Sequence, residues 1–353
     1  MYPAFQPNPE FAVGLNSDNP FLDNPAAEVA TTVEERPATP VVPLGVRHNR
    51  HFIEANTKPV DIAHLRADCV VPVFSKDNEV TISHQSFIET VLGAAHRMFP
   101  QEVIDAPDIV VSHIIKGRIP EAIHKPVNQL LETDKTIYYE RMMFCFEIPT
   151  ICQDIDGNPL KLTVGGVRAY NHENLYNRKS AEKFKVFVGF QNRVCCNMCV
   201  STDGYKSEIK VMNTQALFQA VMELFQLYNP EKHTRQMQTL VNSSMTEHQF
   251  AQLLGKSRLY QCLPQEDKKR LPQLLMTDTQ INLVARAYYQ DEAFGVDAQS
   301  REISMWKGHN PLTGANKSSY IDNFLDRALN ASQLAEGINK ALYGESEYRW
   351  FVE

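Results

Sequence analysis

Basic side chains gather in a short stretch that prolines stiffen. Lys116, Arg118, His124 and Lys125 lie around two X-Pro steps, at Pro120 and Pro126. Each proline has a fixed φ and pushes the residue before it toward an extended conformation. This ordering lowers the entropy that the segment loses when it binds an anion. The pattern predicts either a contact with phosphate or another anion, or a stiff solvated connection whose charges only keep it soluble.

The segment that follows carries charges inside an apolar strand. Residues 137–148 alternate as a strand, and both of its faces are apolar in the middle, which is typical of a central strand covered on both sides. Arg141, Glu140 and Glu147 would then be partly buried and would need partners. Arg141 and Glu147 are about 20 Å apart along a strand, so their partners are neighbouring elements or a ligand. We therefore add His113 and Arg141 to the candidate anion-binding residues.

A second polar surface is predicted around Asp203-Gly204, which we interpret as a two-residue hairpin turn. That register places Asn197 directly opposite Lys210, on a face that also carries Cys199 and Glu208. The polar face is either solvated structure or a working surface. Asn197 and Lys210 thus complete the candidate set as secondary contacts.

Spacing argues against the familiar catalytic and metal motifs. Cys196 and Cys199 are three residues apart on a strand and point to opposite faces, so they cannot share one zinc ion. The sequence has no GxSxG, GxxxxGK[ST] or GxGxxG segment, and hence no local sign of a serine nucleophile, a P-loop or a Rossmann site. We predict no cofactor and no metal, and the sequence identifies no catalytic residue. A metal-dependent nuclease built on Glu208 and Lys210, with Asp203 or Asp156, or on Glu140, remains an alternative.

The elements that must position these residues indicate an α+β fold. Strands are predicted at about 70–74, 80–83, 108–115, 137–148, 160–170 and 184–190, and helices at about 85–99 and 126–132, with a helical pattern throughout after Asn213. Asp156-Gly157 predicts a hairpin in which Glu147 lies diagonal to Arg168, with a bulge at Pro149. A mostly antiparallel sheet followed by a helical half is the expected class. The expected regions are a disordered tail at 1–50, a β-rich region at 51–213 and a helical region at 214–353 packed on it.

The totals restrict the setting. The chain has 353 residues, a net charge of −7 and seven scattered cysteines, so it is neither a globally basic coat protein nor a disulfide framework. Nine Lys/Arg against four Asp/Glu in 161–210 allow a locally basic face. There is neither a leader nor a run of 18 apolar residues, so we expect a soluble, cytoplasmic protein without membrane contact. Phe5, Phe11 and Phe21 in the proline-rich tail are candidate anchors for a protein partner.

Two long segments carry a family resemblance. SHIIKGRIPEAIHKP and KTIYYERMMFCFEIP, with VPVFSKDNEVTISHQSFI before them, resemble domain of unknown function family 3871, an uncharacterised bacterial family, over about residues 50–353. More distantly, RVCCN (Arg193–Asn197) and Trp306 with Asn310-Pro311-Leu312-Thr313 are similar to motifs of the phage/plasmid-like domain of unknown function family 932. That second resemblance implies that the protein is encoded by a mobile genetic element, such as a phage, a plasmid or a conjugative element.

Three hypotheses about function follow. The first is a non-enzymatic, nucleic-acid-associated accessory protein of a mobile element, in which Lys116, Arg118, Lys125 and Arg141 contact phosphate of DNA or RNA. The second is the metal-dependent nuclease or hydrolase. The third is a protein-interaction module, such as an inhibitor of host defence, that binds a host or element-encoded protein through its helical half and residues 1–50.

Overall fold

The computed structural model describes residues 52–69, 81–122, 124–173, 181–192, 196–290, 301–344 and 346–353. The chain divides into two compact units, 1–48 and 49–353, and every described residue belongs to the second. The expectations for the tail at 1–50, with Phe5, Phe11 and Phe21, and for a strand at 70–74 lie outside the described residues. Antiparallel sheets occupy the first half of the described chain and helices the second, which confirms the α+β class.

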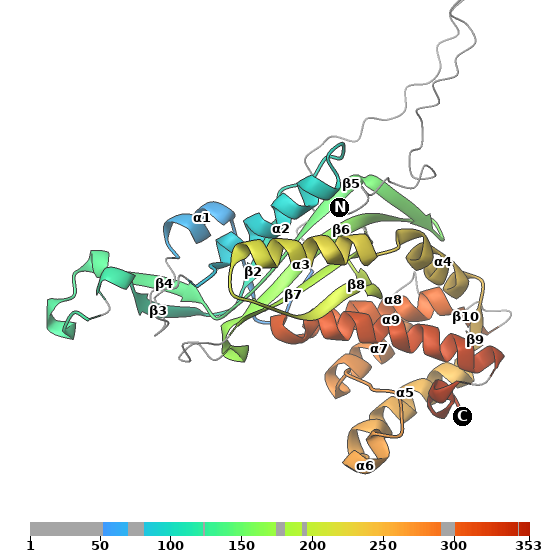
Figure 1. Ribbon diagram of the computed structural model, residues 1–353. Helices are drawn as coiled ribbons and strands as arrows, with labels where there is room; N and C mark the ends of the chain where they lie inside the picture. The colour runs from blue at the N-terminus through green and yellow to red at the C-terminus, as the bar shows by residue number, and fades with distance from the viewer. Residues whose placement is uncertain are drawn as a thin grey trace, which may run out of the picture. The chain divides into compact units, whose positions relative to one another are not determined.

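The centre of the fold is a six-stranded antiparallel sheet in the order β1-β2-β5-β6-β7-β8 (Figure 1). The spatial order of these strands is the same as their order in the sequence, so all five neighbouring pairs are consecutive among the strands of this sheet. The strands are β1 (Lys58–Val60), β2 (Asp108–Val111), β5 (Arg141–Ile155), β6 (Asn158–Ala169), β7 (Glu182–Asn192) and β8 (Met198–Val211).

Helices cover both faces of this sheet. On one face α2 (His84–Met98) packs beside α3 (Thr214–Leu227), and the Phe87 ring of α2 lies 5.2 Å from Phe144 and 4.7 Å from Phe184. On the other face, the first half of α9 (Ile321–Tyr343) packs its Phe324 into a cluster with Met143 of β5. The middle of β5 is therefore buried on both sides, as its apolar alternation predicted.

The other helices are mainly in the second half of the chain. They are α1 (Ile62–Ala67), α4 (Pro230–Val241), α5 (Glu247–Cys262), α6 (Gln265–Lys268), α7 (Asp278–Gln290) and α8 (Met305–Ala315), with η5 (Tyr170–His172), η7 (Asn316–Ser318) and η8 (Glu347–Phe351) as 3-10 turns. Two three-residue strands, β9 (Ser244–Thr246) and β10 (Glu302–Ser304), pair with each other. Ser83, Asn213 and Thr246 are the N-caps of α2, α3 and α5, and each side chain accepts a hydrogen bond from a backbone N–H of the first turn. The short strand expected at 80–83 does not form at 81–83.

The predicted strand at 137–148 is in fact two strands. It breaks at Glu140, so that β4 (Lys135–Tyr139) leaves the main sheet and pairs with β3 (Ile114–Arg118) in a separate hairpin. We call residues 114–139 the β-arm, which extends away from the sheet in Figure 1. The strand expected at 108–115 likewise divides between β2 and β3.

The end of the β-arm contains no α-helix. The 3-10 turn η2 (Pro120–Ala122) forms where Pro120 predicted a turn, but the helix expected over 126–132 is wrong. Two 3-10 turns, η3 (Val127–Gln129) and η4 (Glu132–Asp134), replace it. Leu130 and Leu131 between them have extended backbone, with ψ of 125° and 164°, which interrupts the helical hydrogen bonds.

The hairpin of β5 and β6 keeps its predicted register only near the turn. Cys152 pairs with Lys161 as expected, but Ile148 pairs with Leu162, because a bulge accommodates the residues between Ile148 and Cys152, Pro149 among them. Glu147 consequently lies opposite Thr163 and forms its ion pair with Lys161 at 2.5 Å, not with Arg168. Pro149 predicted that the bulge exists but not how far it shifts the register.

The second Asp-Gly pair is not a hairpin turn. β8 runs without interruption through Asp203 and Gly204 and pairs with β7, so that Lys210 lies opposite Lys183 and not opposite Asn197. A Cβ on Gly204 would lie 2.2 Å from the carbonyl oxygen of Val188. Glycine is required there because the neighbouring backbone is too close for a side chain.

Candidate functional site

The structure separates the predicted anion-binding residues into distinct places. Lys116 and Arg118 lie on β3 and Lys125 near the end of the β-arm, whereas Arg141 begins β5 in the main sheet. His113 lies just before the arm, with its imidazole Nε2 3.9 Å from a carboxylate oxygen of Glu140. The structure therefore does not bring all of the predicted residues together.

Most of these residues already contact other groups of the chain. Lys125 donates to both carboxylate oxygens of Asp134, at 2.7 and 2.9 Å, and this bond lowers the pKa of Asp134. The Arg141 guanidinium lies 3.5 Å from Glu140 and 3.7 Å from Asp322 of α9. Lys210 pairs with Glu208 at 2.7 Å. These cations are neutralised within the protein and are poor candidates for an external phosphate.

Asn197 is a structural residue. It is buried, and its amide nitrogen donates to the backbone oxygen of Asn310 in α8 at 3.0 Å. Asn197 ends the RVCCN segment, and Asn310 belongs to the Trp306–Thr313 segment, so the bond joins two sequence motifs that are far apart in the chain. The pairing with Lys210 on a working surface is wrong for both residues.

The locally basic segment 161–210 forms no basic face among its described residues. Each of its described Lys and Arg side chains has a carboxylate partner: Lys161 with Glu147, Arg168 with Glu173 and Glu182, Lys183 and Lys210 with Glu208, Lys185 with Asp326, and Lys206 with Glu223. A surplus of cations along the sequence is thus compensated by acids from other elements.

One face of the β-arm is basic. Arg118 lies directly opposite Lys135, and Lys116 opposite Ile137, so the three cations project from the same face of the two-stranded ribbon. Lys116 is exposed and has no ion pair among the described residues, and Arg118 donates to a backbone carbonyl. Lys135 pairs at 2.5 Å with Glu132, whose side chain is 89% exposed, a contact that contributes little in water. We call Lys116, Arg118 and Lys135 the basic face.

The base of the arm continues this face. Tyr139, opposite Ile114, is buried, and the exposed Lys58 ammonium of β1 lies 5.1 Å from its ring centre. The His64 imidazole of α1 contacts the Tyr139 hydroxyl at 2.9 Å, so α1 anchors the ribbon to the body. Sequence reasoning missed Lys58 and Lys135. Lys135 could have been identified if residues 114–118 and 135–139 had been assumed to form a hairpin. In that hairpin Lys135 shares a face with Lys116 and Arg118.

A cluster of buried titratable groups lies elsewhere, at the start of α2. Arg168 is fully buried and is bound by the carboxylates of Glu173 and Glu182, while its guanidinium carbon lies 4.5 Å from the Tyr170 ring centre. Glu182 also accepts from the backbone N–H of Ile82. Burial raises the pKa of Glu173. The His84 ring also packs against the Tyr170 ring, and the two ring centres are 4.7 Å apart.

This cluster fixes the state of its histidine. Burial, helped by the nearby Arg168 charge, lowers the pKa of His84 to about 3, so the ring is neutral. Its Nε2 lies 2.8 Å from the carbonyl of Tyr139 and must therefore carry the proton. A neutral base and carboxylates already bound to arginine make this a structural lock between α2, β6 and β7. No local pattern could have revealed it, because its members span residues 82–182.

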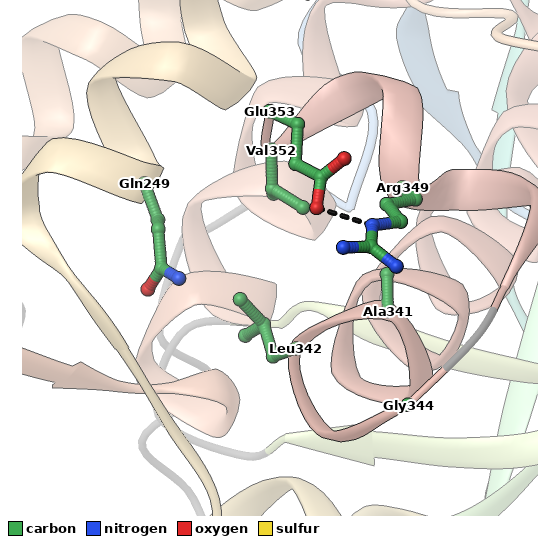
Figure 2. Close-up of a pocket in the computed structure, with 7 residues that line it drawn as sticks. All are labelled: Gln249, Ala341, Leu342, Gly344, Arg349, Val352 and Glu353. Carbon is green, nitrogen blue, oxygen red and sulfur yellow. Dashed lines mark hydrogen bonds and ion pairs between the residues drawn. The ribbon is translucent and has the colours of Figure 1, made fainter.

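One cavity among the described residues lies near the end of the chain (Figure 2). Its volume is about 370 Å³, and Gln249, Leu342, Val352 and the hydrogen-bonded pair Arg349 and Glu353 are among the side chains around it. It contains none of the residues that the sequence analysis singled out. A cavity of about 90 Å³ lies beside His172 and Ser207, and both of its lysines are already paired, Lys183 with Glu208 and Lys185 with Asp326.

The residues proposed for a nuclease are not arranged around a metal. Glu208 binds Lys183 and Lys210, and Asp203 accepts a hydrogen bond from Ser201 at 2.7 Å. Over the described part of the chain, no three His, Cys, Asp or Glu side chains are grouped closely enough to hold a metal ion. None of its helices is both long and apolar enough to cross a membrane.

Comparison with known proteins gives one match. The family model described as "Domain of unknown function, B. Theta Gene description (DUF3871)" matches residues 35–352. No curated protein and no solved structure matches the chain significantly. The match extends the sequence resemblance some 15 residues toward the N-terminus and includes the β-arm and all of the described helices.

Proposed function

The chain belongs to the DUF3871 family, and we propose that it is a non-enzymatic, nucleic-acid-associated accessory protein that binds a phosphate backbone with its β-arm. The observation that supports this proposal is the basic face, Lys116, Arg118 and Lys135 side by side on a two-stranded ribbon. A mobile genetic element and the cytoplasm are the proposed setting, in keeping with the second family resemblance.

The shape of the arm favours duplex DNA over single strands. The major groove of B-DNA is wide enough for a two-stranded β-ribbon. Single-strand binders instead stack bases on exposed aromatic rings. The aromatic residues of the arm are Tyr138, which is half-buried, and Tyr139, which is buried, so neither offers an open stacking surface. Contacts from lysine and arginine to phosphate position a protein on DNA without selecting a sequence.

The test is a salt titration of binding to a 30-base-pair duplex and to the matching single strand. We expect measurable affinity at low salt, a stronger affinity for the duplex, and a logarithmic salt dependence. Because each lost phosphate contact lowers the slope by about 0.9, Lys116→Ala with Arg118→Ala should lower it by about 2.

A matched control removes the same charge elsewhere. Lys269 and Arg270, exposed at the end of α6, serve this purpose. Lys269→Ala with Arg270→Ala should leave the affinity and the slope unchanged if the basic face is the interface. No binding of the wild-type protein at low salt, or equal losses in the two double variants, would refute the proposal.

A further inference from the structure

The tip of the β-arm exposes large apolar side chains. Val127 is 76% and Leu131 62% exposed, and Pro126 beside them is also exposed. Val127 lies on η3, and Leu131, four residues later, directly precedes η4; both belong to neither hydrophobic cluster of the described chain. Exposed apolar residues grouped on one projecting element are typical of a contact surface.

The backbone that carries them is braced from within. Besides its two bonds from Lys125, the Asp134 carboxylate accepts the backbone N–H of Leu131 at 2.9 Å. Arg118 in turn donates to the carbonyl oxygen of Lys125 at 2.6 Å. Asp134 is almost completely buried, with a side chain 6% exposed. The tip is therefore preorganised, and its apolar side chains lose little backbone entropy on insertion.

The charges of the tip also point inward or are compensated. Asp134 is neutralised by Lys125 and Glu132 by Lys135, which leaves Glu121 as the acid of the tip without an ion pair among the described residues. The cations Lys116 and Arg118 lie directly behind it on β3. The order along the arm is thus a basic ribbon followed by an apolar end.

We propose that Val127 and Leu131 form a wedge that enters between base pairs of the duplex bound by the basic face, an inference that rests on the function proposed above. Apolar wedges of this kind unstack a base step and kink the duplex, at a cost that is lower where stacking is already weak. The ligand class is therefore duplex DNA with a weakened step, such as a mismatch or a nick, which the arm holds in a bent form.

The experiment compares a 30-base-pair duplex with the same duplex carrying a central two-base mismatch, both labelled at the ends for energy transfer. Wild-type protein should bind the mismatched duplex at least about tenfold more tightly and bring the ends closer together. Val127→Ser with Leu131→Ser should abolish the preference and the bending, while affinity for the intact duplex and its salt slope stay within about twofold.

The control carries the same substitutions at exposed apolar positions away from the arm. Val103 and Leu259 are 61% and 59% exposed, so Val103→Ser with Leu259→Ser should behave as wild type. Wild-type binding without preference or bending would overturn the wedge but leave the basic face standing, whereas no binding to either duplex would overturn both. If the tip variant instead abolishes self-association and leaves bending intact, the tip is a protein contact and the wedge is wrong.

Discussion

Burial decides which charged side chains hold the protein together. Arg168 is fully buried between Glu173 and Glu182, so neither carboxylate can be replaced by water. Breaking a buried ion pair by removing one of its partners costs about 3–5 kcal/mol. We therefore expect Glu182→Gln to lower the free energy of unfolding by that amount in urea titrations. Glu208→Gln, which removes a carboxylate from the half-exposed pairs with Lys183 and Lys210, should leave the free energy of unfolding close to that of wild type; equal losses in the two variants would contradict the lock.

Buried histidines make stability depend on pH. Burial lowers the pKa of His233 and of His309 to about 4 and, with Arg168, that of His84 to about 3, from 6.5. Their contribution is complete above pH 6.5 and is lost as the pH falls toward 4, because only the unfolded chain then binds the protons. Glu173 and Glu336, whose pKa burial raises, act in the opposite direction just above pH 4.5.

His309 offers a direct measurement of this effect. Its side chain is buried, stacks on Trp306 and contacts the Ser332 hydroxyl at 3.4 Å. One such histidine changes the free energy of unfolding by up to about 1.4 kcal/mol per pH unit, so wild type should lose about 2 kcal/mol more than His309→Gln between pH 7 and pH 5. Urea titrations at the two pH values measure the difference. A parallel loss in both proteins would show that His309 is protonated in the folded state.

For individual residues, the sequence predicted that basic side chains lie near one another but not which groups they contact. Lys116 and Arg118 lie together on the basic face, whereas Lys125 and Arg141 are bound by Asp134 and Asp322. Asp322 is 181 residues from Arg141 in the sequence, so no spacing rule could connect them. A local excess of cations says nothing about acids that arrive from distant elements.

Elements whose ends are encoded locally were predicted well. The side chains of Ser83, Asn213 and Thr246 cap α2, α3 and α5 because a cap needs only the backbone of the next turn. The β-arm was missed because the break at Glu140 depends on which strand lies beside it, and β4 is as apolar as β5. The helix expected from Pro126 does not form for a similar reason, because the Asp134 carboxylate accepts the backbone N–H of Leu131.

The two Asp-Gly pairs show how one motif serves two purposes. Asp156 and Gly157 have φ of 54° and 72° in an open turn, whereas Gly204 lies inside β8 against the Val188 carbonyl. Asparagine tolerates positive φ but still carries a Cβ. We therefore expect Gly157→Asn to change the unfolding free energy by about 1 kcal/mol or less, and Gly204→Asn to cost about 2–3 kcal/mol by overpacking. Thermal unfolding of both variants distinguishes the two roles, and equal stability would show that Gly204 has room for a side chain.

Over the second unit as a whole, one hydrophobic core joins the sheet to the helices. Phe144 and Phe190 of the sheet share a continuous cluster with Met237 of α4 and Leu334 of α9, and the first half of α9 covers the opposite face of the sheet. Residues 49–213 would keep α2 but lose α3 and α9, so apolar surface would be exposed on both faces of the sheet. Apolar surface exposed on this scale cannot be offset by the remaining contacts.

We therefore expect residues 49–353 to unfold in one cooperative transition and residues 49–213 not to fold when produced alone. Near- and far-ultraviolet circular dichroism should give coincident urea curves for the longer chain, while the shorter one should lack a near-ultraviolet signal and bind a hydrophobic dye. The expected division at residue 213 would then mark a change of secondary structure inside one folding unit. A cooperative transition in 49–213 would instead make the sheet a domain in its own right, and the β-arm could be studied on that fragment.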